Sequence, residues 1–315
     1  MSELKFEYMD DFAEAVKNEV SKRLEKEVRV KKIRQNNATV RYGLVIIEKG
    51  INLNATIYLD YYYGIYEQVG MEAVIERVIS VYEKNKPSES IDLHELLNFE
   101  KIRSRLGAKL INYEKNMEYL RNIPHTRFLD LAIVPIIIWK VDDTGRESIV
   151  VNNNMKKEWG VSTTEIIDIA LENIKEDILQ LNILEVVSIN KALAVMFSEV
   201  TMEPVEEIMR SVIKKIENEI PMYVFTNHLK TQGAIALLQT DKFRELADRL
   251  KVDYLYIIPS SIHECIARPC DPGEDNIEDI RKMVIEINQD FVADEEILSD
   301  KVYIYSKSEN RIAIA

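Results

Sequence analysis

Two neighbouring apolar segments in the C-terminal part of the chain constrain its fold more than any other feature of the sequence. The stretch KVDYLYIIPSSIHECIARPC predicts two strands, Tyr254–Ile258 and Ile262–Ala267, joined by a tight turn. Pro259 fits the second position of a type I turn because its ring presets φ, and two serines complete that turn. The first strand is apolar on both faces, which is typical of a central strand covered on both sides. We therefore expect this hairpin to lie at the centre of a sheet.

The segments around this hairpin predict an α+β fold. From Met222 onwards, strand and helix patterns follow each other in the order ββαββαββ, which is typical of helices that cover antiparallel sheets. The segments expected on either side of the hairpin are the strands Met222–Phe225, Ala234–Leu238, Val302–Tyr305 and Arg311–Ile314 and the helices Asp241–Leu250 and Ile277–Asn288.

The N-terminal part of the chain predicts one helix and then three strands. An apolar stripe indicates a helix over Phe6–Leu24. Alternating apolar residues indicate strands over Val28–Arg34, Thr39–Glu48 and Ala55–Leu59. Gly43 lies inside the second of these strands, and an isolated glycine in a strand indicates a bulge.

The middle of the chain carries three further structural predictions. Apolar residues at helical spacing from Phe99 to Leu120 predict one long helix. The apolar run Phe128–Val141 predicts a strand, in which Pro135 marks an edge or a bulge because proline has no N–H to donate. Ser162 and Glu165 form a capping box, which predicts the start of a helix.

The stretch Leu181–Glu203 predicts the boundary between two parts of the chain. It is apolar but has no clear capping residues, and regular strand and helix patterns begin just after it. We therefore expect an N-terminal α+β unit, residues 1–185, and a C-terminal α+β unit, residues 200–315, or else one fused domain.

Composition and glycine spacing exclude several classes of function. Apolar residues make up 46% and charged residues 30% of the 315 residues, which is the composition of a folded chain. The closest two glycines, Gly64 and Gly70, are too far apart for a dinucleotide-binding loop or a Walker A loop. The net charge of −13 disfavours nucleic acid as a partner. The basic run Arg29–Arg34 alternates with apolar residues, so we expect it to be the solvated face of a strand.

The sequence also predicts a cytoplasmic location. The acidic N-terminal segment has no apolar region of the kind that a signal peptide needs. The longest apolar run, Leu131–Trp139, is much shorter than the roughly 20 residues of a membrane-spanning helix. Two cysteines in a chain of this length do not form a disulfide framework.

The predicted hairpin concentrates side chains that are reactive in other proteins. Ser260 or Ser261 with His263 and Glu264 has the composition of a nucleophilic triad. His263 and Glu264 are consecutive in a predicted strand, however, so they should point to opposite faces. We therefore expect the serines and the histidine to be structural rather than catalytic.

A metal site in the hairpin is also disfavoured. His263 and Cys265 would share a strand face, and Cys270 follows closely. The spacing between the two cysteines is outside the usual range for zinc, and a fourth ligand would have to come from elsewhere in the chain. We therefore expect no metal and no cofactor.

His125, Arg127 and Asp130 lie just ahead of the long apolar run, and this is where we first look for a site. Arg127 and Asp130 would face opposite ways in a strand but would pair if the segment began as a helical turn. Polar residues that lead into a buried strand are common at binding sites. The candidate ligand-binding residues are therefore His125 and Arg127, together with His263.

Four stretches of the chain carry a resemblance to a known family: TIYLDYYYGIYEQVG, LINYEKN with PHTRFLDLAIV, MYVFTNHLKTQGAIALL and YLYIIPSSIHECIARP. Together they resemble the bacterial domain-of-unknown-function family 5688, over nearly the whole length of the chain. More distantly, the region Asn152–Ile174 and the part after Met222 are similar to domain-of-unknown-function family 1444. The resemblance implies a bacterial cytoplasmic protein of one architecture. It implies no activity, cofactor or catalytic residue.

We expect the chain to be a non-enzymatic protein that acts by binding a protein partner. This expectation rests on the lack of a phosphate loop, of metal-ligand spacing and of an assembled triad in the sequence, and its acidic composition suits a basic partner. The alternative is an enzyme or small-ligand binder with a site assembled from distant residues near Arg127 and His263. A third hypothesis, a mimic of nucleic acid, would need the carboxylates to cluster on one face.

Overall fold

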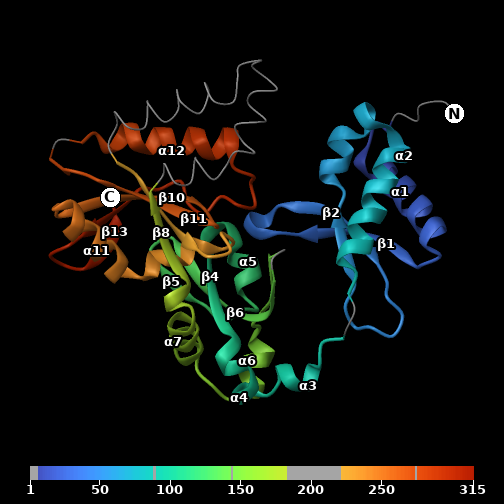
Figure 1. Ribbon diagram of the computed structural model, residues 1–315, viewed down its shortest axis with the longest axis horizontal. Coiled ribbons are helices and arrows are strands. Elements are labelled where there is room, and N and C mark those ends of the chain that lie inside the picture. Colours follow the sequence, from blue (N-terminus) through green and yellow to red (C-terminus); the bar gives the residue numbers. More distant parts are fainter. Residues whose placement is uncertain (1–5, 88–89, 143–144, 183–220, 274) are drawn as a thin grey trace. The chain divides into compact units, whose positions relative to one another are not determined.

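Figure 1 shows the computed structural model of the chain, which describes residues 6–87, 90–142, 145–182, 221–273 and 275–315. The chain forms two compact units, Met1–Glu95 and Leu96–Ala315. Both contain helices and antiparallel sheets, which confirms the predicted α+β class. Of the described helices, none combines the length and the apolar character that crossing a membrane requires.

The N-terminal unit places two helices on one face of a three-stranded sheet. Its elements are α1 (Met9–Leu24), β1 (Val28–Arg34), β2 (Val40–Ile46), β3 (Ala55–Tyr58) and α2 (Asp60–Asn85). The strands pair antiparallel in the order β1-β2-β3. One cluster of buried apolar side chains joins the helices to the sheet, including Phe12, Leu44, Ile57 and Val74. The predicted helix and the three predicted strands are confirmed, with small shifts at their ends.

Gly43 does not form the predicted bulge. β2 pairs with β1 and with β3 without a shift of register, and Gly43 lies opposite Lys31 and Tyr58. A Cβ atom at Gly43 would lie 2.4 Å from Cδ1 of Ile33. Gly43 therefore leaves the space that the end of the Ile33 side chain occupies on this face of the sheet.

The C-terminal unit contains two sheets, of which the first has four strands. These are β4 (Leu106–Asn112), β5 (Thr126–Phe128), β6 (Leu131–Asp142) and β7 (Gly145–Val150). β6 pairs with β4 along one side and with β5 and then β7 along the other. The predicted strand Phe128–Val141 thus corresponds mainly to β6, which pairs with the segment that follows it, β7.

Pro135 lies in an inner strand, so the prediction of an edge or a bulge is wrong. On one side of β6, the pairing with β5 ends at Ile133 and the pairing with β7 begins at Ile136. Pro135 lies between them and accepts a hydrogen bond from the N–H of Val151 at 3.1 Å. An N–H at this position would point to the same side as the carbonyl, into the gap between the end of the pairing with β5 and the start of the pairing with β7. No ladder hydrogen bond is therefore lost.

The predicted long helix from Phe99 to Leu120 is wrong. The segment forms α4 (Phe99–Ile102), a 3₁₀ turn η2 (Arg103–Arg105), strand β4, a second 3₁₀ turn η3 (Glu114–Asn116) and α5 (Met117–Leu120). Six of the seven residues of β4 are buried. A strand buried on both faces has a nearly continuous apolar sequence, which matches helical spacing equally well.

The second sheet has six antiparallel strands in the order β13-β12-β10-β11-β9-β8. Their bounds are β8 (Ile178–Asn182), β9 (Tyr223–Asn227), β10 (Tyr254–Ser261), β11 (Glu264–Pro269), β12 (Tyr303–Ser306) and β13 (Arg311–Ile314). β10 is an inner strand, and Leu255 to Ile258 are all buried. α12 (Ile277–Phe291) packs against the face that carries Tyr256 and Ile258. α11 (Thr240–Leu250) places Phe243 on the opposite face, 4.3 Å from the ring of Phe225. The predicted central strand, covered on both sides, is confirmed.

The turn of the central hairpin differs from its prediction. β10 continues through Pro259 to Ser261, and the turn is made by Ile262 and His263. The register with β11 shifts between Ile258 and Ser261. Proline is tolerated at such an irregularity because the ladder there does not need its N–H. His263 is therefore a turn residue and does not share a strand face with Cys265.

The predicted ββαββαββ order is wrong at its second strand. Residues Gly233–Leu238 form a 3₁₀ segment, η5, in place of the predicted strand Ala234–Leu238. A Cβ atom at Gly233 would lie 2.3 Å from Oγ1 of Thr226 and 2.6 Å from the carbonyl oxygen of His263. The backbone of η5 therefore packs directly against β9 and the hairpin turn, where a strand residue with a side chain would not fit.

The two helices that follow β7 in the chain begin at asparagine or serine caps. Asn152 caps α6 (Asn153–Trp159) by accepting a hydrogen bond from the N–H of Met155. The predicted helix start at Ser162 is confirmed by α7 (Thr163–Asn173), where the Ser162 hydroxyl accepts a hydrogen bond from the N–H of Glu165 at 3.1 Å.

The predicted boundary between residues 185 and 200 falls outside the described residues and stays a prediction. The division that the described residues show lies at Glu95 and Leu96. β8 precedes the predicted boundary and β9 follows it, and the two strands pair from Ile178 to Asn182 in one sheet.

Candidate functional site

Two of the three candidate residues meet on one tyrosine in the C-terminal unit. The guanidinium carbon of Arg127 lies 4.6 Å from the centre of the Tyr113 ring. The centre of the His125 ring lies 5.9 Å from the same ring, with the two planes inclined at 49°. A cation over an aromatic face is attracted by the ring quadrupole. We refer to Tyr113, His125 and Arg127 together as the Tyr113 surface.

The Tyr113 surface is built where the chain leaves β4 and returns to β5. Tyr113 follows the last residue of β4, and its N–H donates to the carbonyl of Asp130 at 2.9 Å. The chain then passes through η3 and α5 before His125 and β5. Tyr113 packs against a small apolar core beneath it, formed by Ile111, Leu120, Ile123, Ala132 and Val134. The surface therefore lies on the folded segment between β4 and β6, residues 113–130, rather than on a long irregular loop. We refer to this segment as the excursion.

A buried carboxyl group anchors the second half of this excursion. Asp130 is only 5% exposed, and it accepts hydrogen bonds from the Ser299 hydroxyl at 2.6 Å and from the Tyr303 hydroxyl at 2.8 Å. Burial, and then the negative charge of Asp130, raise the pKa of Tyr303 above its usual range. The phenol therefore stays protonated and remains a donor at any physiological pH.

Two buried asparagines anchor the first half of the excursion. Asn112 donates from Nδ2 to the carbonyl of Leu298 at 3.1 Å and accepts from the N–H of Lys115 at 2.9 Å. Asn116 donates to the carbonyl of Asn112 at 2.8 Å. Both ends of the excursion are thus tied by buried hydrogen bonds to the segment 298–303, and this fixes the Tyr113 surface on a rigid base.

His125 is held in one orientation and presents its second ring nitrogen. Its Nδ1 lies 2.8 Å from the carbonyl oxygen of Ile123. Because a carbonyl can only accept, Nδ1 carries the proton, and Nε2 is the acceptor in the neutral ring. The neutral ring can therefore accept a hydrogen bond through Nε2.

Arg127 and Asp130 do not pair, although they are three residues apart. Arg127 donates from Nε to the carbonyl of Leu129 at 3.0 Å and stays exposed, whereas Asp130 points inward. Within the described ranges, the terminal amino groups of Arg127 make no hydrogen bond. The guanidinium is thus positioned by its own backbone and by Tyr113, with its outer donors open.

His263 lies apart from His125 and Arg127, and no contact among the described residues joins them. Its Nδ1 accepts from the N–H of Gln232 at 3.3 Å, so Nε2 carries the proton in the neutral ring and faces Glu296 Oε1 at 3.5 Å. Both ring nitrogens are therefore occupied, and no lone pair remains for a general base.

Ser261 is not activated by His263. Its hydroxyl oxygen accepts a hydrogen bond from the main-chain N–H of His263 at 3.1 Å, and the residue is 9% exposed. A nucleophilic serine needs the ring nitrogen of the base within reach of its oxygen. The hydrogen bond that is present stabilises the turn instead. The Ser260 side chain lies outside the described residues.

The two cysteines, Cys265 and Cys270, are free thiols. Burial raises the pKa of the Cys265 thiol above its usual range and that of Cys270 to about 12. Neither sulfur is therefore a thiolate near neutral pH. No group of three or more His, Cys, Asp or Glu side chains suited to a metal ion is found in the part of the chain that the structure describes.

The sequence predicted His125 and Arg127 but did not predict Tyr113 or the buried hydrogen bonds that anchor the surface. The repeated asparagines of the LINYEKN stretch were the available signal, because buried amides at the end of an apolar run need partners. Ser299 and Tyr303 carried no such signal, since they lie 169 and 173 residues from Asp130.

The fold and the Tyr113 surface define an α+β protein with an exposed cation–aromatic surface on a buried polar base. The chain belongs to the family of unknown function DUF5688, whose model matches residues 9–307. This match confirms the first resemblance, while the more distant similarity to family 1444 is not shown. None of the curated proteins matches the chain, and no solved structure does.

Proposed function

We propose that the chain binds a protein partner through the Tyr113 surface, extended by the exposed side chains of α5. Met117 is 56% exposed and Tyr119 is 40% exposed. Tyrosine, methionine and arginine are the residue types enriched at the centres of protein interfaces. The observation that carries the proposal is the guanidinium of Arg127, stacked on Tyr113 with its terminal amino groups available to a carboxylate of the partner.

The rigid base of the surface supports this proposal. Ordering a flexible loop on binding costs free energy that a pre-organised surface does not lose. The buried hydrogen bonds of Asn112 and Asp130 hold the excursion in place without a ligand. Arg127 and His125 are likewise oriented by main-chain carbonyls.

The charge of the chain supports a protein rather than a nucleic acid as the partner. At a net charge of −13, the chain as a whole repels a polyanion. The exposed guanidinium of Arg127 can still donate hydrogen bonds to a single carboxylate, while the net negative charge of the chain favours basic groups on the same partner. We take the bacterial cytoplasm to be the location of this non-enzymatic binding, because composition and the family resemblance agree on it.

A crosslinking experiment followed by titration tests the proposal. A photo-crosslinking amino acid at Tyr119 in the native host would capture the partner, which is then purified and titrated by calorimetry. Arg127→Ala should raise Kd at least tenfold, about 1.4 kcal/mol, because it removes the stacked cation.

Arg249→Ala is the matched control. Arg249 is also exposed, and its guanidinium carbon lies 5.3 Å from the centre of the Tyr223 ring, in a contact of α11 with β9 that shares no residue with the Tyr113 surface. It should leave Kd unchanged. An unchanged Kd for Arg127→Ala would refute the proposal.

A small-ligand binder or enzyme is the second candidate, and the orientation of His125 favours it. The guanidinium of Arg127 could bind a carboxylate, and Nε2 of His125, on the same tyrosine, could accept a hydrogen bond from a hydroxyl or amino group of the same ligand. Titration with succinate, followed by the ring signals of His125 in NMR spectra, distinguishes the two. A saturable shift that Arg127→Ala abolishes would favour the small-ligand site.

A further inference from the structure

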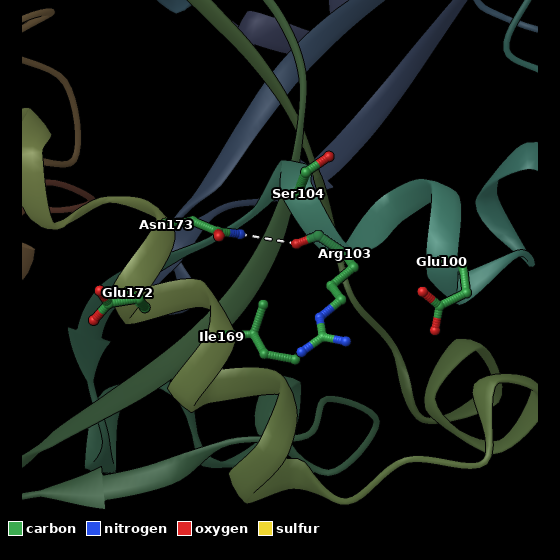
Figure 2. A pocket seen from close by; sticks show the side chains of 6 residues that line it. All are labelled: Glu100, Arg103, Ser104, Ile169, Glu172 and Asn173. Atoms are coloured by element: carbon green, nitrogen blue, oxygen red, sulfur yellow. Dashed lines mark hydrogen bonds between the residues drawn. The ribbon is translucent and has the colours of Figure 1, made fainter.

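A second site lies where the turn η2 meets the end of α7, apart from the residues of the Tyr113 surface. A pocket of about 330 Å³ opens there, lined by Glu100, Arg103, Ser104, Ile169, Glu172 and Asn173. Pockets of 300–1,000 Å³ are typical of small-molecule sites. Figure 2 shows Arg103 beside Ile169, with Glu100 and Glu172 on opposite sides of the pocket.

The rim of this pocket is fixed by one side chain of α7. Asn173 donates from Nδ2 to the main-chain carbonyls of Arg103 at 2.8 Å and of Leu106 at 2.9 Å. The first of these bonds is the dashed line in Figure 2. Because both amide protons are used, the carbonyl oxygen of Asn173 is the group left for a ligand. Ile169 supplies an apolar wall from the same helix.

The charged groups of the pocket are not paired with one another. Within the described residues, neither Glu100 nor Glu172 forms an ion pair with Arg103, although Glu100 is only three residues away. At the same spacing, Lys86 and Glu83 close to 2.7 Å. The guanidinium of Arg103 instead lies along Ile169 (Figure 2). One cation and two carboxylates thus border the cavity at distances beyond an ion pair.

We infer that this pocket binds a small zwitterion of the α-amino acid class with an apolar side chain. The carboxylate would meet the Arg103 guanidinium, whose fork matches it with two parallel hydrogen bonds. The ammonium group would meet Glu100 or Glu172, and the side chain would lie on Ile169. A phosphate ester fits poorly, because two carboxylates border the same cavity and repel a dianion.

Methyl NMR of the full chain tests this inference with L-leucine as the probe. The δ1 methyl signal of Ile169, assigned with the Ile169→Val variant, should shift saturably with L-leucine. N-acetyl-L-leucine lacks the ammonium group, and L-leucinamide lacks the carboxylate. Each should bind at least tenfold more weakly than L-leucine. Equal binding of either derivative, or no saturable shift with L-leucine, would overturn the inference.

Substitutions show which side chains bind the carboxylate and the ammonium group of L-leucine. Arg103→Ala should abolish the shift, whereas Arg77→Ala, at an exposed arginine of the N-terminal unit, should not change it. At least one of Glu100→Gln and Glu172→Gln should weaken L-leucine at least tenfold while leaving N-acetyl-L-leucine unaffected. Retained affinity in Arg103→Ala, or in both glutamine variants, would contradict the proposed orientation. Because these side chains are exposed, the variants should fold, and circular dichroism checks this.

Discussion

The N-terminal unit pairs its charged groups at the surface, whereas the C-terminal unit joins its two sheets through buried polar groups. Arg23 donates two hydrogen bonds of 2.7 Å to Glu72, which is 60% exposed. Asp130, Ser299 and Tyr303 are each at most 5% exposed. Water can replace a lost partner at the surface but not in the interior. Removal of one hydrogen-bond partner should therefore lower the free energy of unfolding much more in the C-terminal unit than in the N-terminal unit.

Asp130→Ala should give the largest loss of stability. It leaves two buried hydroxyl groups, on Ser299 and Tyr303, without their acceptor, and the expected cost is about 2–5 kcal/mol. Both tryptophans of the chain, Trp139 and Trp159, lie in the C-terminal unit, so urea unfolding followed by tryptophan fluorescence measures this unit alone.

Asp168→Ala, at an exposed position of α7, is the control for Asp130→Ala and should leave the urea midpoint nearly unchanged. If the two variants lost equal stability, the buried polar base would not be what holds the two sheets of the C-terminal unit together.

Gly233→Ala should have the next largest effect. The new methyl group would collide with Thr226 and with the backbone of His263, and the expected cost is about 1–3 kcal/mol.

Gly64→Ala is the opposite case, because Gly64 lies within α2 and a Cβ atom there meets nothing within 4 Å. That variant should gain about 0.5–1 kcal/mol, since alanine favours the helix. Urea midpoints of the two units measure both effects, and a destabilised Gly64→Ala would be inconsistent with an open site.

Glu48→Gln should have a smaller effect that depends on pH. Hydrogen bonds from Lys26, and then from Tyr82, lower the pKa of Glu48. A lowered pKa in the folded state means that its contribution is present above the ordinary value of about 4.3 and is lost as pH falls through the folded value. The contribution should be under about 1 kcal/mol, because Lys26 is partly exposed.

Methyl NMR of Ile57 during urea unfolding follows the N-terminal unit for this comparison. The wild-type midpoint should fall more steeply below about pH 4.5 than that of Glu48→Gln, because the glutamine does not titrate. Parallel pH profiles for the two proteins would argue against the role of Glu48.

Arg23→Ala should have the smallest effect of the four. Its partner Glu72 is mostly exposed, so water and salt replace the lost pair. The Ile57 signal should report an unchanged urea midpoint, with and without added sodium chloride. A clear loss of stability here would remove the contrast between the two units.

Local sequence patterns correctly predicted the elements that depend on contacts between residues close in the sequence. The strand Val28–Arg34 matches β1 because Val28 and Val30, two residues apart, mark the face that packs on the core. The cap at Ser162 was predicted because its partner is only three residues away. Elements defined by distant packing were missed. Leu106–Asn112 matched a helical period because both of its faces are buried, and η5 depends on the backbone of His263 against Gly233.

The candidate site divides in the same way. The sequence indicated His125 and Arg127 because polar residues precede a buried strand. It could not show that Tyr113 lies beneath both, since this contact requires β4 and β6 to pair. It also grouped His263 with them, because composition does not reveal that both ring nitrogens of His263 are occupied by Gln232 and Glu296.

Pro135 has a consequence for how the first sheet of the C-terminal unit selects its alignment during folding. Sliding β6 by one residue would turn its apolar side chains to the wrong face, but sliding it by two residues would preserve that alternation. Burial alone therefore cannot reject the two-residue slip. Such a slip would place the ring of Pro135 opposite a carbonyl of β5 or β7 that needs a donor. The proline thus acts as a marker of correct alignment, which distinguishes the native pairing from the misaligned pairing that most resembles it.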